Sequence, residues 1–562
     1  MITPTVLLLV TACSPSAADA PPGLVGRQDC AALLESLRTA TLARTGPLGV
    51  EGSLDPSGGG PAAVAPVPAD DPSAAADLPD TVELLPGGAP RALAAAGRRL
   101  FVLDGRDGSV QRRIRLPRGY ETARVLSDGS RALLLTGHDP DGTGPGAPVA
   151  RLLLVDLATG GTLGELRMPG VLVDARRSGP LVRVSVRALP RLDFAAPPSK
   201  DDSAWNDYAP RAVERNKDVV RDAPAEAFHP AYDVTVSGET VRHRVPCNRI
   251  NRPRDDVAES VLTVFTFDLS KPLGDGAPLA VAGGHAAVHG TATSLYVAET
   301  PPGTATTRVH RIDLTPDRPL YVGSGSVVGE VLGPGGLSEH KGHLRVAVGD
   351  PGRTVGDLYV LETSGPRLDT IGRLIDVSGD SGIRAVRFLG DRAYVTTDRA
   401  KGPLPALDLS DPAHPRRLGE LPFPAASTSL LPSAEGRVVA VGQPRTGRGR
   451  PQGLRVSLFG PSADGPLADL RGPGLPGARV EHDPRAYLHD PATGLTVLPT
   501  VPHAAAVLSV TPQGVTRLGT LRHRSAPITR ALLVGDTLLT FSSAGVMVSD
   551  AARLKRRAWT AF

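Results

Sequence analysis

Short apolar runs separated by turns recur along the chain from about residue 81 to its end. In the clearest copies a Val/Leu-rich run ends in an acidic residue and a turn. These copies are LLLVDLATG (152–160), VFTFDLSKP (264–272), HRIDLTPD (310–317), LYVLETSG (358–365), PALDLSDPAHP (405–415) and VMVSDAARL (546–554), with weaker ones at 454–464 and 506–514. Runs this short, rich in β-branched residues and bounded by turn residues, predict β-strands.

The ends of these runs are regularly spaced. With Asp156, Asp268, Asp313, Glu362, Asp408, Phe459, Ser509 and Asp550 as anchors, the steps are 112, 45, 49, 46, 51, 50 and 41 residues. A period of this length, with about four strands per unit, is typical of a β-propeller blade. We therefore predict an all-β protein with a single β-propeller over 81–562, favouring eight blades, with seven or nine as alternatives. A shortened unit at 91–117, anchored at Asp104, would add the ninth.

Each unit has a predicted internal order. The third strand should end at the anchor, whose carboxylate accepts a hydrogen bond from the backbone N–H two residues on and fixes a tight turn. We expect the N- and C-terminal strands to pair and so close the ring, because closure removes open sheet edges.

The segments outside the repeat have their own character. Residues 1–13 form a signal, and 14–80 combine a Ser/Ala/Pro-rich tether, a short amphipathic helix over 31–44 and a Gly/Pro/Ala-rich linker over 46–79 that we expect to be disordered. The 112-residue step contains an insertion at about 194–258, with helical spacing in part. Insertions in repeat arrays form loops on one face, so this one is expected to cap the propeller.

The first residues resemble an export signal. An apolar run at 6–10 leads into Val10-Thr11-Ala12-Cys13, which resembles a bacterial lipobox. We therefore expect lipid on Cys13 and a place on the outer face of the cell membrane, with plain secretion as the alternative. The run is too short to span a bilayer, and no other stretch is long and apolar enough to do so.

The chain has three cysteines, Cys13, Cys30 and Cys247. If Cys13 carries lipid, an oxidising exterior favours a Cys30–Cys247 disulfide, and two unpaired thiols are the alternative. The long spacing and the absence of a CxxC motif argue against a structural zinc site.

Charge excludes one class of partner. The 62 basic and 58 acidic residues give a net charge of +4, without a basic stripe that carries interleaved aromatic residues. A nucleic-acid role therefore has little support. The 63 glycines and 55 prolines suit a fold with many turns.

No organised catalytic set stands out, and we predict no catalytic residues, no metal and no cofactor. Glu339, His340 and His343 are candidate metal ligands, and on a single strand 339 and 343 would share one face while 340 would point to the other. A second candidate cluster, for a metal ion or for acid–base chemistry, is Glu481, His482, Asp483, His489 and Asp490. The Asp-rich turns at 104–108 and 139–142 resemble fragments of calcium-binding loops. Polar residues at strand ends and turns are the favoured interpretation of all of them.

Several segments resemble a known family. They are SEHKGHLRVAV (338–348), VRFLGDRAYVTT (386–397), LDLSDPAHPRRLGEL (407–421), HDPRAYLHDPATGLTVLP (482–499), LVGDTLLTFSSAGVMVSD (533–550) and VPCNRINRP (245–253). They are similar to secreted bacterial proteins with a C-terminal β-propeller domain distantly related to WD40 repeats, and the composition favours an actinobacterial lipoprotein member. The segment 81–99 lacks the acidic motif usual at the first blade of that family. The resemblance implies the propeller fold and no assigned activity.

Fold and signal together favour a non-enzymatic scaffold, tethered to the membrane, that binds a protein, peptide or glycan at the cell envelope. The alternative is an exported hydrolase or lyase with carboxylates and histidines at the mouth of the propeller channel. The sequence leaves the ligand and the oligomeric state open.

Overall fold

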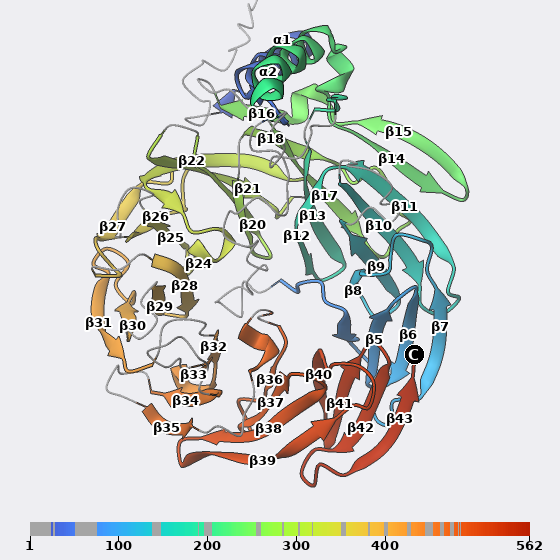
Figure 1. Ribbon diagram of the computed structural model, residues 1–562, viewed down its shortest axis with the longest axis vertical. Coiled ribbons are helices and arrows are strands. Elements are labelled where there is room, and N and C mark those ends of the chain that lie inside the picture. The colour runs from blue at the N-terminus through green and yellow to red at the C-terminus, as the bar shows by residue number, and fades with distance from the viewer. Residues whose placement is uncertain are drawn as a thin grey trace, which may run out of the picture.

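The fold is a ring of antiparallel sheets around a central axis (Figure 1). The structure is a computed structural model. It describes residues 24–25, 29–50, 76–137, 148–188, 190–195, 205–253, 260–283, 286–301, 304–316, 318–349, 356–379, 383–397, 403–423, 429–443, 453–460, 466–471, 477–481, 483 and 485–562. Within these residues nine sheets have the four-strand core of a propeller blade. Nine lies within the expected range and is one more than the favoured count.

The first three blades are built as follows. Blade 1 contains β4 (Val82–Leu84), β5 (Arg91–Ala96), β6 (Arg99–Asp104) and β7 (Val110–Arg115). Blade 2 contains β8 (Arg124–Ser127), β9 (Arg131–Thr136), β10 (Val149–Asp156) and β11 (Thr162–Pro169), extended by the hairpin β14 (Ala231–Val236) and β15 (Glu239–Arg244). Blade 3 contains β12 (Val171–Ser178), β13 (Leu181–Ala188), β17 (Ser260–Asp268) and β18 (Leu279–Gly283), extended by β16 (Ile250–Pro253) and β1 (Leu24–Val25).

Blades 4 to 6 follow in chain order. Blade 4 contains β19 (Ala286–Gly290), β20 (Ser294–Glu299), β21 (Thr306–Asp313) and β22 (Leu320–Val328). Blade 5 contains β24 (Leu337–His340), β25 (His343–Gly349), β26 (Gly356–Glu362) and β27 (Thr370–Leu374), with β23 (Glu330–Val331) also on β25. Blade 6 contains β28 (Ile383–Leu389), β29 (Arg392–Thr397), β30 (Leu404–Asp408) and β31 (Arg416–Leu421).

The last three blades complete the ring. Blade 7 contains β32 (Ser429–Pro432), β33 (Val438–Gly442), β34 (Arg455–Phe459) and β35 (Pro466–Arg471). Blade 8 contains β36 (Leu488–His489), β37 (Leu495–Thr500), β38 (Ala504–Thr511) and β39 (Gly514–Arg522). Blade 9 contains β40 (Arg530–Val534), β41 (Thr537–Ser542), β42 (Gly545–Asp550) and β43 (Arg556–Ala561).

The predicted repeat matches this blade structure. In every blade the anchor residue falls at or near the end of the third strand, including Asp104 in the unit that sequence analysis treated as shortened. The carboxylates of Asp104, Asp268, Asp313 and Asp408 each accept a hydrogen bond from the backbone N–H two residues on, at 2.8–3.1 Å. The acidic anchors therefore fix turns, as predicted.

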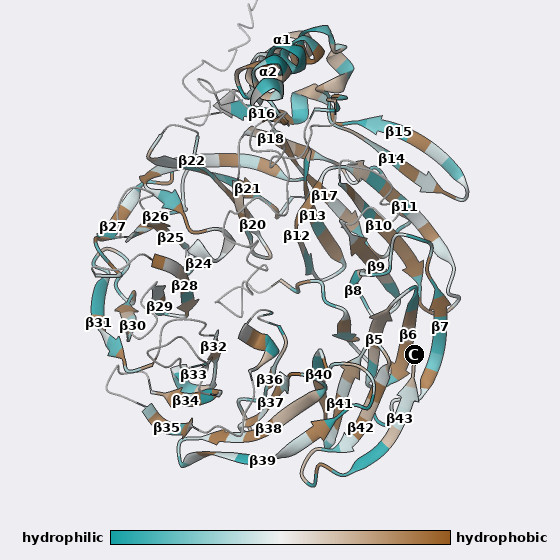
Figure 2. Cartoon of the chain, viewed as in Figure 1, coloured by the Kyte–Doolittle hydropathy of each residue, from teal (hydrophilic) through white to brown (hydrophobic). Residues whose placement is uncertain are grey.

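Apolar side chains are buried mainly between neighbouring blades. Nine separate clusters of buried apolar residues occur among the described residues, one at each blade-to-blade interface. Inner strands such as β9 are almost fully buried, whereas the outer strands β7 and β15 are mostly exposed. Figure 2 shows the same gradient, with hydrophobic residues along β9, β10 and β17 and mostly hydrophilic ones along β15. Burial of apolar surface between sheets thus favours the ring.

The ring closes without pairing between its first and last sheets. Blades 1 and 9 are each made of four consecutive strands, and within the described chain no strand of one pairs with a strand of the other. The expectation of closure by paired terminal strands is therefore wrong. Side chains close the ring instead, because one apolar cluster joins both blades and the rings of Phe101 and Phe562 stack with centroids 4.3 Å apart.

A small module lies outside the ring, beside β16 and β18 (Figure 1). It contains α1 (Cys30–Ala43), α2 (Trp205–Asp222), the hairpin β2 (Thr45–Gly46) and β3 (Gly49–Val50), and the short 3₁₀ helices η2 (Ala225–Ala227) and η3 (Cys247–Arg249). For the described residues of the insertion, the expectation that it caps the propeller is wrong. Leu33 and Leu37 of α1 and Val220 of α2 are buried against blades 2 and 3, which holds the module at the outer edge.

Two expectations concern residues outside the described part of the chain. They are the lipid on Cys13 and most of the linker, residues 51–75. No helix among the described residues combines the length and apolar character needed to cross a membrane.

Candidate functional site

The inner wall of the ring is formed by the first strand of each blade and by one added segment. Residues 76–81, which we call the strap, precede β4 and lie inside the ring (Figure 1). The strap is held by backbone hydrogen bonds on two blades. Asp77 and Arg177 of β12 exchange N–H···O bonds of 2.8 and 2.9 Å, and Asp80 and Val125 of β8 exchange bonds of 3.3 and 2.8 Å. The strap therefore ties the inner edges of blades 2 and 3 to the start of blade 1.

Charged side chains also join the strap to the last two blades, on the other side of the ring closure. Arg530 of β40 donates from Nε to both carboxylate oxygens of Asp80, at 2.9 and 2.8 Å. It also donates from Nη1 to Oδ2 of Asp483 at 2.7 Å. Arg485 donates to the carbonyl oxygen of Pro79, and Arg177 forms an ion pair with Asp77. The strap is thus joined to blades 8 and 9 by arginine contacts, and to blades 2 and 3 by its backbone and by the ion pair of Asp77 with Arg177.

Glu83 of β4 adds an unusual carboxyl group beside the strap. Its Oε1 accepts from the backbone N–H of Ser127 at 3.2 Å and lies 3.8 Å from Arg177, while its buried Oε2 has no hydrogen-bond partner. Burial raises the pKa of Glu83 to about 8, against the lowering effect of the Arg177 charge. The nearby carboxylates of Asp77 and Asp80 raise it further. Glu83 therefore exists mostly as a neutral acid near pH 7.

Glu339, His340 and His343 do not assemble into a metal site. They lie on a hairpin, with Glu339 and His340 on β24 and His343 on β25, so the expectation that 339 and 343 share one strand is wrong. Glu339 accepts from Thr291 Oγ1 of blade 4 at 3.1 Å. His340 contacts Asp391 of blade 6 at 3.0 Å. The two side chains therefore point to different blades.

The residues near 481–490 are also separated by their partners. Asp483 binds Arg530, and His489 bridges Thr496 and Ser433 at 2.8 and 2.9 Å. Asp490 accepts from the backbone N–H of Ala492 at 3.2 Å and caps a turn. Glu481 ends the short helix η6 (Arg479–Glu481), and His482 is outside the described residues.

The two calcium candidates give a similar result. Asp104 and Asp107 accept from the backbone N–H groups of Arg106 and Ser109, both at 2.8 Å, so they cap turns. Residues 139–142 are outside the described part of the chain.

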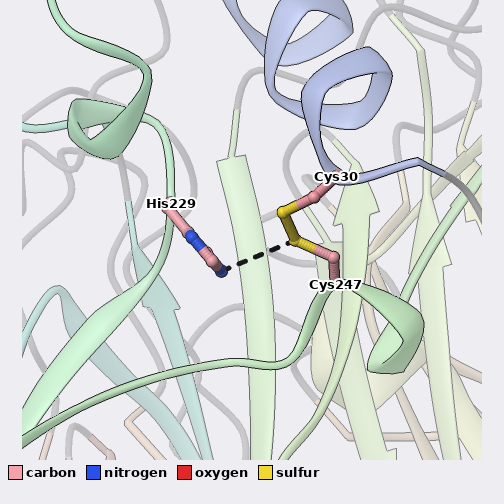
Figure 3. A group of neighbouring side chains, drawn as sticks. All are labelled: Cys30, His229 and Cys247. Atoms are coloured by element: carbon pink, nitrogen blue, oxygen red, sulfur yellow. Dashed lines mark hydrogen bonds between the residues drawn. A yellow bond between two sulfur atoms is a disulfide. The ribbon is translucent and has the colours of Figure 1, made fainter.

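A further group of side chains, Cys30, His229 and Cys247, lies in the module outside the ring, and we call it the rim cluster. In it, Cys30 and Cys247 form the expected disulfide, with their Cα atoms 5.4 Å apart. Figure 3 shows His229 beside it. Its Nε2 lies 3.8 Å from Cys247 Sγ and 2.7 Å from the carbonyl oxygen of Val245. Among the described residues this is the only group of three His, Cys, Asp or Glu side chains placed to share a metal ion. Sequence analysis missed His229, because it is 18 residues from Cys247 and no spacing rule joins the two.

These observations define an all-β propeller whose inner polar groups are engaged with one another. The chain belongs to the β-propeller domain family, since the family model described as "Beta propeller domain" matches residues 72–554.

Two archaeal relatives are similar in sequence. An uncharacterised protein of Methanocaldococcus jannaschii is 30% identical over 242 residues, which cover 41% of this chain and 36% of that protein. An uncharacterised protein of Archaeoglobus fulgidus is 37% identical over 142 residues, which cover 24% of this chain and 20% of that protein. The matched regions thus span about a third or less of either relative.

Among solved structures, the computationally designed Ika8 protein aligns with a TM-score of 0.37 at 10% identity, covering 84% of this chain and 95% of that one. The Saccharomyces cerevisiae protein Sqt1 aligns with a TM-score of 0.34 at 10% identity, covering 49% of this chain and 74% of that one.

Proposed function

We propose that this protein is an exported, lipid-anchored propeller that binds a protein, peptide or glycan at the cell envelope and catalyses no reaction. The observation that carries the proposal is the separation of the inner acids and histidines. Asp80 and Asp483 are both paired with Arg530, whereas Glu339, His340 and His489 engage partners in three other places, Thr291, Asp391 and Ser433. An enzyme site needs such groups to converge on one point about 3 Å from the reacting atom.

Export has separate support. The motif Val10-Thr11-Ala12-Cys13 resembles a lipobox, and a disulfide joins Cys30 to Cys247 across 217 residues. Disulfides persist mainly in oxidising compartments outside the cytoplasm. A lipid on Cys13 would place the propeller at the membrane surface, where its rim and loops are free to meet a ligand.

Anchoring is tested with the full chain and its Cys13→Ser variant, each expressed in a bacterium fed an alkyne analogue of palmitate. We expect the parent chain to carry the label and to fractionate with membranes, and Cys13→Ser to lose both properties. A parent chain that stays unlabelled in the cytoplasm, with Cys30 and Cys247 as free thiols, would contradict the proposal.

Binding is tested by chemical cross-linking of the anchored chain in intact envelopes, followed by mass spectrometry. We expect a partner or glycan that binds the purified chain again and leaves the complex chemically unchanged. Turnover of that ligand by the purified chain would contradict a purely binding role.

A further inference from the structure

When its disulfide is reduced, the rim cluster offers two sulfur ligands and one nitrogen ligand for a cation. Two sulfur atoms and the Nε2 of His229 lie within 4.8 Å of one another, although Cys30 is 217 residues from Cys247 in the chain. Four-coordinate Zn²⁺, with Zn–S of about 2.3 Å and Zn–N of about 2.0 Å, places bound sulfur and nitrogen roughly 3.5 Å apart. The observed Nε2–Sγ distance to Cys247 is 3.8 Å, so His229 already stands near a ligand's position.

The frame around these residues does not depend on the disulfide alone. Leu33 and Leu37 of α1 share a buried apolar cluster with Phe228 and Val245, which flank His229 and Cys247 in the chain. Arg38 donates to the carbonyl oxygen of Ala223 at 3.0 Å, and its guanidinium lies 5.5 Å from the Phe228 ring centre. Opening the S–S bond therefore leaves other contacts that keep Cys30 next to His229 and Cys247.

We propose that, after reduction of the Cys30–Cys247 disulfide, the two cysteine sulfurs and His229 bind a thiophilic divalent cation such as Zn²⁺. Reduction by a dithiol breaks the S–S bond, gives two cysteine thiols and converts the dithiol to its own disulfide. Binding of the cation displaces the two thiol protons. His229 binds through the lone pair of Nε2, with its ring proton on Nδ1, and gives up the bond to Val245.

The charges of the three ligands match a divalent cation. Two thiolates and a neutral imidazole bind a divalent cation with no net charge left over. Because all three side chains are only half-buried, water can supply the fourth ligand.

The test uses the full chain with Cys13→Ser, so that Cys30 and Cys247 are its only cysteines. A phosphine reductant opens the disulfide, takes oxygen from water as phosphine oxide and leaves two thiols. Titration with Co²⁺ should then give a thiolate-to-cobalt charge-transfer band and the visible bands of four-coordinate cobalt at one ion per chain. Zn²⁺ should bleach these bands, and the oxidised chain should show none.

Two variants test whether His229 is a ligand of the cation. In the reduced chain, His229→Ala should weaken Co²⁺ binding at least about tenfold. His414→Ala should leave it unchanged, because His414 pairs with Asp411 in an exposed turn of blade 6. Equal binding by His229→Ala and the parent, or a reduced chain without the thiolate band, would overturn the proposal. Loss of the module's folded circular dichroism on reduction would also overturn it, because the frame would then need the disulfide.

Discussion

The pKa values of carboxyl groups in this protein shift in opposite directions according to their surroundings. At the turn after β42, the backbone N–H of Arg553 holds the pKa of Asp550 below its usual value, and an ion pair with Arg557 adds to the effect. Glu83 is buried beside Asp77 and Asp80, and its pKa rises to about 8. The turn aspartates were predictable because their partners follow within a few residues. The raised pKa of Glu83 could not be predicted from the sequence, because Ser127 and Arg177 approach it from other blades.

The raised pKa of Glu83 gives a pH dependence of stability. A carboxyl group whose folded pKa lies above its unfolded value stabilises the fold fully below about pH 4.5, and this contribution is lost as pH rises through about 8. The free energy of unfolding of the parent chain, measured with urea, should therefore fall more steeply from pH 5 to pH 9 than that of Glu83→Gln. The difference should reach a few kcal/mol, because each pKa unit corresponds to about 1.4 kcal/mol.

Glu83→Gln is a close match, since its amide oxygen can still accept from Ser127. The histidines that titrate in this range are present in both chains, so their effect cancels in the comparison. Parallel pH profiles for the two chains would show that Glu83 titrates normally and is not a neutral buried acid.

At the scale of elements, the strand order within a blade followed from the sequence, but the detail of pairing did not. In eight of the nine blades the third and fourth strands pair with a register shift. A β-bulge of this kind bends the outer strand and increases its twist. The tight hairpin of β24 and β25 was missed because a single long strand and a two-strand hairpin share the same alternation of apolar residues. The strap was missed because its contacts lie up to 450 residues away.

Arg530 is the side chain that joins the strap to the last blades. Arg530→Ala should lower the free energy of unfolding by roughly 2–3 kcal/mol, because it leaves two half-buried carboxylates, Asp80 and Asp483, without their charged partner. The side chains of Arg530 and Asp80 are only 10% and 17% exposed. Urea unfolding followed by circular dichroism measures the loss.

Arg416→Ala is the matched control, because the side chain of Arg416 is 71% exposed and its partner Asp408 keeps its hydrogen bonds from the backbone N–H and the hydroxyl of Ser410. It should change the free energy of unfolding by less than about 1 kcal/mol. Equal losses in the two variants would mean that the strap contributes nothing beyond an ordinary surface ion pair.

At the scale of the whole molecule, the repeat period predicted the propeller but not its closure. Regular spacing of turns reports how many blades a chain can form, because each anchor marks one third strand. It does not report which surfaces meet at the ends of the chain. Here the first and last blades pack face to face through one apolar cluster, and the strap crosses from blades 2 and 3 to blade 9. The disulfide could be predicted from the number of cysteines, whereas the position of His229 beside it could be learned only from the fold.

The central claim is that the strap is an ordered part of the inner wall that ties blades 2 and 3 to blade 9 across the ring closure. Hydrogen–deuterium exchange of the full chain, read by mass spectrometry over peptides that cover residues 76–85, tests it most directly. The amides of Asp77 and Asp80 donate to the carbonyl oxygens of Arg177 and Val125, so they should exchange as slowly as the inner strands β8 and β12. Exchange of these amides at the rate of an unstructured chain, while β8 and β12 stay protected, would contradict the account.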